Sequence, residues 1–297
     1  MEQQSDITTL KECGVTVGTF DGVHRGHREV VEFLVAESRR RGLRPLVITF
    51  DPHPLAVIAP QRAPQLLEHT SERVDALRSL GADVVVLKFT EELRRHTAAQ
   101  WLRRLASEFN AKMVVAGFDN TFGTDGRDMT FADYARIGAS QGLEIIEAPR
   151  LPDVSSTLIR HALLEGDVAK AATMLGHPYA ITGIVTHGRE LGRTIGTPTA
   201  NLLPDTKLLI PTPGVYAADA VTDGTRNRSV VNIGVAPTVG TGLPLTIEAH
   251  LLDFSGNLYD SELRLEFLKR LRPERRFESL GELKTQIAAD ILSARNL

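Results

Sequence analysis

The sequence predicts two domains, an α/β domain built on a parallel sheet and an antiparallel β domain that ends in a helix. Short apolar runs alternate with amphipathic helical segments through the first half of the chain, as in a parallel sheet covered by helices. From Ile181 onward this periodicity gives way to short β-rich runs between turn residues, the pattern of a compact antiparallel barrel or sandwich. The 297 residues suffice for both, and we expect domains at 1–180 and 181–297.

The composition is that of a globular protein, with 42% hydrophobic and 24% charged residues and a net charge of −3. This balance argues against a general nucleic-acid binder. A single cysteine, Cys13, cannot form an internal disulfide, which favours a reducing compartment. The first residues lack the features of a signal peptide, and no apolar run approaches the roughly 20 residues that span a bilayer. We expect a cytoplasmic monomer or weak homo-oligomer, without nucleic-acid or membrane partners.

The first strand leads into a glycine-rich turn within residues 15–27, V-T-V-G-T-F-D-G-V-H-R-G-H. Its β-branched and aromatic start suits a buried strand, and Gly18 and Gly22 permit a sharp turn before the next helix. Helix N-termini bind anions, and His24 and His27 could donate hydrogen bonds to phosphate oxygens. A tight turn with two solvated histidines is the alternative. Two histidines spaced between glycines favour a phosphate site.

The other elements of the first half continue the alternation. The second strand ends abruptly at the two prolines of Asp51-Pro52-His53-Pro54. Thr97 and Gln100 form a capping box at the start of a helix. The expected strands are 45–50, 83–89, 112–116 and 143–148, and the expected helices after the first are 71–80, 97–109 and 130–141.

Four unusual segments each directly follow a predicted strand, namely 18–27, 51–54, 117–123 and 154–160. Ligands of parallel sheets bind outside the carboxyl ends of the strands. We therefore expect these four segments to gather at one sheet edge and to form a site there.

The last of these segments, V-S-S-T-L-I-R, offers hydroxyl groups and a cation to a phosphate. Ser155, Ser156 and Thr157 open a helix, and Arg160 lies one turn later as a possible bidentate donor. A helix cap is the common alternative for S-S-T. Together with the histidine turn, the segment favours a second clamp on a triphosphate. Asp119 is ambiguous, because an aspartate after a strand commonly caps a loop.

In the second half, we expect a helix at 167–175 and strands at 180–185, 214–221, 230–233, 245–252 and 263–267. An amphipathic helix ends the chain, and Ser279 and Glu282 form its capping box. Its buried stripe is expected to hold Leu280, Leu283, Ile287 and Ile291.

Two segments of this half contain candidate binding or catalytic residues. Residues 183–201 form a glycine-rich segment whose amides could cover phosphates, although it matches a P-loop poorly. Thr199 and Asn201 would face one side of an extended segment and offer hard oxygen ligands for magnesium. A glycine-rich hairpin with a polar end is an equally good interpretation. Glu248 and His250 share one strand face, and an exposed sheet face explains such a pair in most proteins.

Nine motifs in this order resemble the bacterial bifunctional riboflavin kinase/FAD synthetase family, from about residue 14 to residue 295. Those of the first half are G-T-F-D-G-V-H-R-G-H, F-D-P-H-P, G-F-D-N-T-F-G and V-S-S-T-L-I-R. Those of the second half are G-R-T-I-G-T-P-T-A-N, P-G-V-Y-A, N-I-G-V-A-P-T, E-A-H-L-L-D-F and R-P-E-R-R-F-E-S-L.

The resemblance implies a Rossmann-like nucleotidyltransferase domain followed by a β-barrel riboflavin kinase domain. The second domain would phosphorylate riboflavin with ATP to give FMN. The first would adenylylate FMN with a second ATP, giving FAD and pyrophosphate. Mg²⁺ or another divalent metal is the implied cofactor, and riboflavin, FMN and ATP are the implied small-molecule partners.

The resemblance also implies residue roles. Glu248 is the base that receives the ribityl hydroxyl proton, and Thr199 and Asn201 hold the magnesium nucleotide. The implied ATP-handling residues of the adenylyltransferase are Gly18, Phe20, Gly22, His24, His27, Asp119, Ser155, Ser156, Thr157 and Arg160, with His24, His27 and Arg160 in catalytic roles. Its flavin contacts are Phe50, Pro52 and His53. The nucleotide-binding residues of the kinase are Gly183, Gly188, Gly192, Arg193, Pro198, Thr199 and Asn201.

Four positions depart from the family's pattern. Asn120 and Thr121 stand where an aromatic and often a basic residue are usual, which bears on the adenylyltransferase's flavin contacts. Thr197 replaces a phenylalanine and Ala236 an arginine, and both leave the metal and base positions intact. Two alternatives to the bifunctional enzyme are a chain with only its kinase half active and a flavin-nucleotide sensor without catalysis. A sensor would not need the base.

Overall fold

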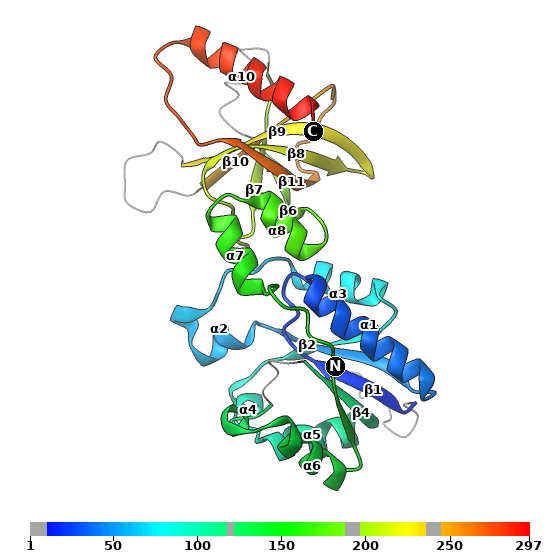
Figure 1. Ribbon diagram of the computed structural model, residues 1–297. Helices are drawn as coiled ribbons and strands as arrows, with labels where there is room; N and C mark the ends of the chain where they lie inside the picture. Colours follow the sequence, from blue (N-terminus) through cyan, green and yellow to red (C-terminus); the bar gives the residue numbers. More distant parts are fainter. Residues whose placement is uncertain (1–10, 118–121, 188–196, 236–244) are drawn as a thin grey trace. The chain divides into compact units, whose positions relative to one another are not determined.

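The structure, a computed structural model, describes residues 11–117, 122–187, 197–235 and 245–297 and divides into two compact units (Figure 1). Unit 1 consists of Met1–Pro64 and His69–Val154, and unit 2 consists of Gln65–Glu68 and Ser155–Leu297. The short segment Gln65–Glu68 belongs to unit 2 because Leu66 forms a parallel β-bridge with Leu208.

Unit 1 is built on a sheet of five described strands in the order β3-β2-β1-β4-β5, and every neighbouring pair is parallel. This arrangement confirms the predicted α/β fold class. The central strands are rich in buried β-branched residues, as expected for a parallel sheet covered on both faces. The strands are β1 (Cys13–Val17), β2 (Arg44–Asp51), β3 (Asp83–Lys88), β4 (Ala111–Ala116) and β5 (Glu144–Glu147).

Helices cover both faces of this sheet (Figure 1). On one face, Leu34 of α1 and Leu77 of α3 pack in one buried cluster. On the other face, Trp101 of α5 and Tyr134 of α6 pack in a second buried cluster. The helical segments of unit 1 are α1 (Arg25–Arg40), α2 (Pro54–Ile58), η2 (Pro60–Arg62), α3 (Thr70–Ser79), α4 (Glu91–Arg94), α5 (Ala98–Glu108), η3 (Gly126–Asp128) and α6 (Phe131–Ser140).

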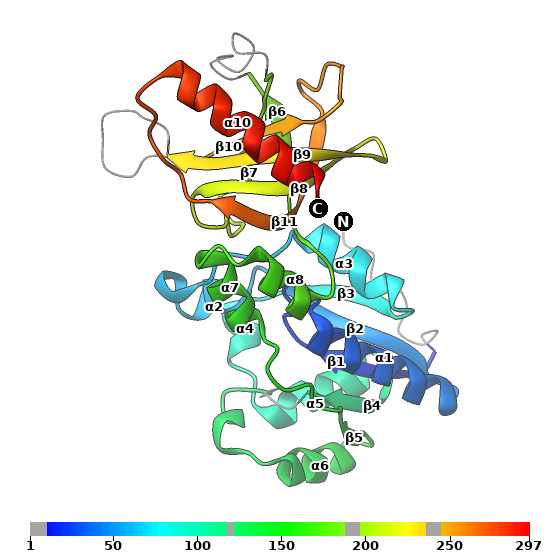
Figure 2. The same ribbon diagram turned by 45° about the horizontal axis from the view of Figure 1, so that its top comes forward.

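Unit 2 is a closed barrel of six described strands in the order β10-β7-β6-β11-β8-β9, and every described pair is antiparallel (Figure 2). The barrel confirms the predicted fold class of the second half. Its interior holds the fully buried rings of Tyr179, Tyr216 and Phe267. The strands are β6 (Tyr179–Thr186), β7 (Ala200–Pro204), β8 (Gly214–Thr222), β9 (Thr225–Val235), β10 (Leu245–Leu251) and β11 (Glu262–Arg272).

Two helices before the barrel, α7 (Ser156–Leu164) and α8 (Val168–Leu175), also belong to unit 2. Helix α8 contacts β6 and β11 and buries Val168, Ala171, Met174 and Leu175. The division between compact units therefore falls between Val154 and Ser155 in the main chain. The functional boundary at residue 180 stays a prediction.

The terminal helix α10 (Leu280–Arg295) begins at the predicted capping residue, Ser279, whose hydroxyl accepts a hydrogen bond from the Glu282 N–H. The predicted buried stripe is wrong at Leu280, which is 68% exposed. Asp290 and Ala294 are buried instead. Asp290 forms a buried ion pair with Arg272 of β11. The spacing of apolar residues cannot reveal this pair, so it does not predict which face of the helix is buried.

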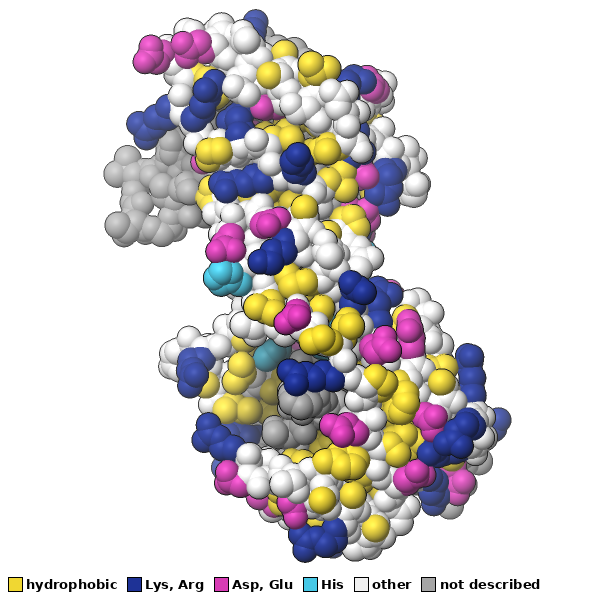
Figure 3. All heavy atoms as spheres, in the orientation of Figure 1, with side chains coloured by type: hydrophobic (Ala, Val, Ile, Leu, Met, Phe, Trp, Pro, Cys, Tyr) yellow, Lys and Arg dark blue, Asp and Glu magenta, His cyan; other side chains and the backbone are white. Residues whose placement is uncertain are grey.

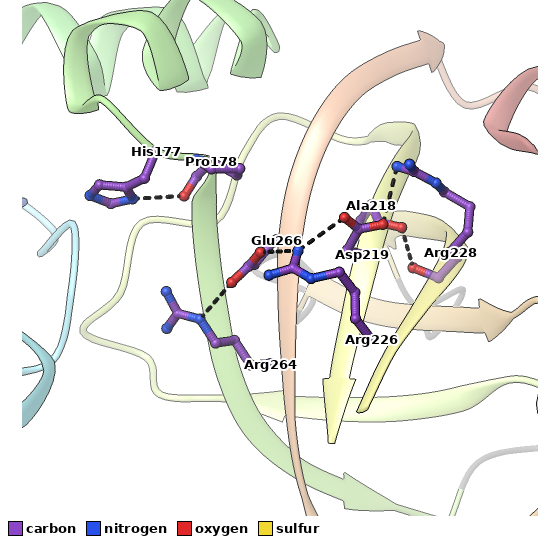
Figure 4. Close-up of polar contacts among 9 residues, drawn as sticks. His177, Pro178, Ala218, Asp219, Arg226, Arg228, Arg264 and Glu266 are labelled. Carbon is purple, nitrogen blue, oxygen red and sulfur yellow. Dashed lines mark hydrogen bonds and ion pairs between the residues drawn. The ribbon is translucent and has the colours of Figure 1, made fainter. Parts of the chain in front are cut away.

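Charged side chains of both signs are interspersed on the face drawn in Figure 3, as the small net charge leads one to expect. Figure 4 shows one such group on the barrel, where Arg226 reaches Asp219 at 3.0 Å and Glu266 at 2.5 Å. Arg228 also reaches Asp219, and Arg264 reaches Glu266. The Asp219 and Glu266 side chains are only 13% and 16% exposed, whereas that of Arg226 is 54% exposed. Ion pairs with a solvent-exposed partner contribute little individually, so this network ties β8, β9 and β11 together only modestly.

Candidate active sites

Unit 1 contains a cavity of about 450 Å³ at the carboxyl ends of its central strands. The cavity brings together three of the four segments that were expected to meet at one sheet edge. Segment 18–27 contributes Gly18, Phe20 and His27, segment 51–54 contributes Pro54, and segment 117–123 contributes Gly117, Phe122 and Gly123.

The turn that follows β1 has an unusual backbone conformation. Phe20 and Val23 have φ angles of 50° and 31°, and Gly22 has a φ of 85°. Positive φ is sterically costly for residues with a side chain. The Val23 N–H donates to the Phe20 carbonyl at 3.0 Å, which closes the turn directly before α1. The predicted sharp turn is therefore present, and two of its residues with positive φ, Phe20 and Val23, are not glycines.

The two histidines of this turn stack against each other, with ring centroids 3.5 Å apart and planes inclined by 17°. His24 is only 5% exposed and is the N-cap of α1, where its Nδ1 accepts a hydrogen bond from the His27 N–H at 3.2 Å. An Nδ1 that accepts carries no proton, so the proton of the neutral ring is on Nε2. His24 is thus a buried capping residue, whereas partly exposed His27 lines the cavity.

Aromatic side chains line much of the cavity wall. Phe50, at the end of β2, makes edge-to-face contacts with Phe89 at 5.4 Å and Trp101 at 6.1 Å between ring centroids. Of the predicted flavin contacts, only Phe50 lines this cavity. Pro52 is exposed beyond the end of the strand, and His53 caps α2 by accepting from the Leu55 N–H.

Phe122 and Gly123, which follow β4 in the sequence, also line the cavity. Gly123 has a φ of 80°, and a Cβ there would lie 2.3 Å from the Ala98 nitrogen, so only glycine fits. The Tyr134 hydroxyl accepts from the Phe122 N–H at 3.1 Å and donates to the Gly126 carbonyl at 3.2 Å. Burial raises the pKa of Tyr134, which keeps this hydroxyl protonated.

The fourth predicted segment, residues 154–160, belongs mostly to unit 2. Ser155 is the N-cap of α7 and accepts from the Leu158 N–H, as the helix-cap interpretation expects. Arg160 donates from Nε to the Gln65 carbonyl at 2.8 Å. The roles of Ser155, Ser156, Thr157 and Arg160 with ATP stay predictions.

Several other predicted or noted positions lie outside the described residues, namely Asp119, Asn120, Thr121, Gly188, Gly192, Arg193 and Ala236.

Unit 2 contains two cavities that share Thr199. One, of about 340 Å³, is lined by Val185, Pro198, Thr199 and the 254–259 segment. The other, of about 330 Å³, is lined by Thr199, Glu248 and His250 on the barrel side. A shared lining residue makes the two cavities neighbours, which suits a reaction between two bound molecules.

Strand pairing brings the predicted kinase residues together. Asn201 of β7 and Asn232 of β9 are the Cα partners of Glu248 on either side of β10. Side chains directly opposite in an antiparallel pair lie about 4.5–5.5 Å apart at Cβ. His250 Nδ1 lies 2.8 Å from the Pro198 carbonyl oxygen, which holds the segment before β7 against β10. Glu248 is partly buried at a cavity wall, so a fully exposed sheet face does not describe its surroundings.

The opposite side of the 330 Å³ cavity is formed by the end of β11 and by α10. Asp290, 4% exposed, binds Arg272 through two guanidinium nitrogens at 2.8 and 3.0 Å. Arg275 lies over the Phe277 ring at 4.6 Å from its centroid. Phe277, Leu283 and Ile287 give this side an apolar surface.

Gly183 does not line either cavity of unit 2. It lies in β6, where a Cβ would approach the Leu203 carbonyl oxygen to 2.6 Å. A close approach of two strands therefore explains this glycine, and its predicted role in nucleotide binding stays a prediction.

The geometry agrees with comparisons to known proteins. A family model described as FAD synthetase matches residues 6–160, and one described as riboflavin kinase matches residues 175–297. The bifunctional riboflavin kinase/FMN adenylyltransferase of Escherichia coli K12 is 39% identical over 290 residues, which cover 95% of this chain and 92% of that protein. The chain belongs to the bifunctional riboflavin kinase/FMN adenylyltransferase family. The resemblance inferred from the motifs is confirmed.

Other relatives extend this result. The protein of the same name from Bacillus subtilis strain 168 is 36% identical over 282 residues, covering 93% of this chain and 89% of that protein. A crystal structure from Streptococcus pneumoniae, described as a macrolide-efflux protein, superimposes with a TM-score of 0.90 at 32% identity, covering 98% of this chain and 96% of that chain. In the part of this chain that the structure describes, no helix has the length and apolar character needed to cross a membrane.

Several residues that line the cavities were absent from the predicted sites. The sequence predicts Phe89 and Trp101 only as parts of a strand and a helix. Arg272, Arg275 and Phe277 belong to the motif R-P-E-R-R-F, which was noted for the family but was given no role. A motif with three arginines and one aromatic residue before a helix was a usable signal for them.

Proposed function

We propose that this chain carries out two consecutive ATP-dependent reactions of flavin cofactor synthesis. Unit 2 phosphorylates riboflavin to FMN, and unit 1 transfers an adenylyl group from a second ATP to FMN, giving FAD and pyrophosphate. The observation that carries the proposal is that each unit has its own cavity, in which a few polar side chains interrupt a largely apolar wall, and is matched by its own family model. These matches support the bifunctional enzyme over the kinase-only and sensor alternatives.

In the kinase, Glu248 is the general base that takes the proton from the ribityl hydroxyl of riboflavin. It lines the 330 Å³ cavity, whose Phe277, Leu283 and Ile287 suit the flat apolar ring system of a flavin. The nucleotide binds in the neighbouring 340 Å³ cavity, and Thr199 lies where the two cavities meet. The transferred phosphoryl group passes at this junction, with positioning and charge stabilisation as the main sources of catalysis.

Thr199, at this junction, and Asn201, which is not among the lining residues of either cavity, fit Mg²⁺ by their chemistry. The Thr199 hydroxyl and the Asn201 side-chain carbonyl are hard oxygen donors, and Asn201 lies opposite Glu248 across the β7–β10 pair. No group of three or more His, Cys, Asp or Glu ligands occurs in the described part of the chain. Mg²⁺ commonly completes its coordination with water and nucleotide phosphates. When bound, it would neutralise phosphate charge during transfer.

In the adenylyltransferase, the turn of residues 18–27 holds the ATP phosphates. The positive end of α1 and its first N–H groups favour an anion there, and His27 lies on the cavity wall as a hydrogen-bond donor. His24 orients this helix start through its capping bond. The aromatic wall of Phe50, Phe89 and Trp101 suits the flavin ring. The participation of Ser155, Ser156, Thr157 and Arg160 rests on the family resemblance.

We further propose a cytoplasmic protein, monomeric or weakly self-associating, that does not bind nucleic acid or membranes. This part of the proposal rests on the near-neutral charge and the single cysteine of the sequence.

Incubating the purified chain with riboflavin, ATP and magnesium tests the proposal, with the flavins resolved by chromatography. The bifunctional enzyme forms FMN first and then FAD. Accumulation of FMN without FAD would leave only the kinase, and unchanged riboflavin would favour the sensor.

A further inference from the structure

Arg73 is a buried cation to which neither reaction assigns a role. It lies on α3, is 2% exposed and forms no salt bridge with any residue that the structure describes. Fully buried arginines are normally paired with an acid. The Arg73 guanidinium instead donates at 3.0 Å to the carbonyl oxygens of Thr19 and Phe50, from Nη1 and Nη2 respectively, and Nη2 also reaches the Thr70 hydroxyl at 3.1 Å.

The two carbonyl groups belong to residues that line the unit 1 cavity. Thr19 lies in the turn after β1, and Phe50 lies near the end of β2. The Thr19 carbonyl also accepts a hydrogen bond from the Thr49 hydroxyl at 3.0 Å. Two donors, one from α3 and one from β2, therefore converge on a single carbonyl oxygen of the turn.

The backbone directly after this carbonyl is strained. Phe20 has a φ of 50° and Val23 a φ of 31°. Such conformations persist only where the surroundings hold them. Because a trans peptide is planar, the Phe20 N–H points opposite to the Thr19 C=O. Fixing that carbonyl toward α3 therefore also fixes the direction of the Phe20 N–H, which points away from Arg73.

We propose that Arg73 is a positioning residue for adenylyl transfer, whose buried guanidinium fixes the Thr19 and Phe50 carbonyls and so holds the 18–24 turn in its phosphate-binding conformation. The inference rests on the proposed adenylyltransferase activity of unit 1. Arg73 acts through the turn and contacts no substrate. The planar fork of a guanidinium suits this task, because its separate nitrogens each donate to a different carbonyl in a fixed geometry, whereas the three N–H donors of a lysine diverge from one nitrogen on a flexible stem.

The test uses full-length chains carrying Arg73→Met and Arg73→Lys. Leu77→Ala is the matched control, because Leu77 is a buried residue of the same helix and is outside the cavity lining. The KM for ATP and the kcat of FMN adenylylation are measured well below the melting temperature of each variant. Riboflavin phosphorylation, measured in the same sample, reports whether unit 2 is intact.

For Arg73→Met, we expect the KM for ATP in adenylylation to rise roughly tenfold or more, as expected from losing hydrogen bonds to a charged group. Arg73→Lys should fall between Arg73→Met and the parent. Leu77→Ala should lower the melting temperature and leave this KM unchanged. Thr49→Val should have less effect in the Arg73→Met background than in the parent, because both side chains hold one carbonyl.

An unchanged KM for ATP in both Arg73 variants, whatever their kcat, would overturn the inference and leave Arg73 a structural residue. If Arg73→Met does not fold, Arg73→Lys decides between these results. A parent chain that makes no FAD from FMN would refute the proposed function itself, which is a different outcome.

Discussion

The two units place their polar groups by different means. In unit 1, the groups come from one short turn, residues 18–27, whose backbone N–H groups and two histidines are neighbours in sequence. In unit 2, Asn201 and Glu248 are far apart in sequence and become neighbours through the β7–β10 pairing. A site of the first kind can be identified from a contiguous motif. A site of the second kind depends on strand register, which a one-residue shift would destroy.

The supporting structures also differ. The turn of unit 1 contains residues with strained backbone conformations. Its Thr19 carbonyl accepts hydrogen bonds from the Thr49 hydroxyl and the Arg73 guanidinium, which fix the turn. The cavity of unit 2 is held on one side by the buried pair between Arg272 and Asp290. Substitutions in one unit should therefore affect one reaction and spare the other.

The largest expected effect is that of Glu248→Gln. Glutamine keeps the shape of the side chain but cannot accept a proton at neutral pH. General base catalysis is typically worth about 10²–10⁴ in rate, so riboflavin phosphorylation should fall by roughly that factor, with little change in Mg-ATP binding and FMN adenylylation intact. Glu262→Gln, at an exposed position of β11, is the matched control. Phosphorylation within a few-fold of the parent would show that Glu248 is not the base.

His27→Ala tests the other unit. Removing a hydrogen-bond donor to developing phosphate charge should lower FAD formation from supplied FMN by roughly 10²-fold. Riboflavin phosphorylation should stay nearly unchanged. Measuring both rates on one preparation checks this expectation. Loss of both activities would mean that His27 supports the fold or that the two units depend on each other.

Thr199→Ala should have a smaller effect of a different kind. Losing one hydroxyl ligand weakens the magnesium nucleotide complex, so the KM for ATP in riboflavin phosphorylation should rise about tenfold, the equivalent of one such interaction. Titrating magnesium at fixed ATP separates this effect from that of Glu248→Gln. A lower kcat at an unchanged KM would instead place Thr199 among groups that act only in the transition state.

The smallest effect on riboflavin phosphorylation is expected from moving the start of a unit 2 fragment from residue 155 to residue 176. Fragments 155–297 and 176–297 should both convert riboflavin to FMN without making FAD. The shorter one lacks both α7 and α8, and Val168, Met174 and Leu175 of α8 are buried in unit 2. Burying such a side chain is worth about 1.5–3 kcal/mol, so fragment 176–297 should unfold at lower denaturant concentration. Equal stability would support a boundary near residue 180.

The sequence predicts a parallel sheet followed by an antiparallel barrel, because the hydrophobic patterns of both domains can be recognised within short stretches of sequence. Buried β-branched runs such as Val15–Val17 alternate with helices, and the change of periodicity after residue 180 is abrupt. Strand β7 was missed because it is short, and Pro198 and Pro204 lie beside or within it. Proline normally argues against a strand.

The sites were predictable only where one motif holds their residues. His24 and His27 lie in such a motif, although nothing in it shows that His24 is a buried cap. Arg73 could not be identified, because an arginine in an amphipathic helix is normally solvent-exposed. Likewise, helical spacing alone assigned Leu283 and Ile287 to a core, whereas they line a cavity.

Mixing two variants tests most directly the claim that each unit carries its own reaction. The Glu248→Gln chain should make FAD from FMN but hardly from riboflavin, and the His27→Ala chain should convert riboflavin to FMN and stop there. With riboflavin, ATP and magnesium, an equimolar mixture should form FAD at a rate close to that of the parent at the same concentration of each active unit. A mixture that accumulates FMN, or leaves riboflavin unconverted, would contradict independent sites.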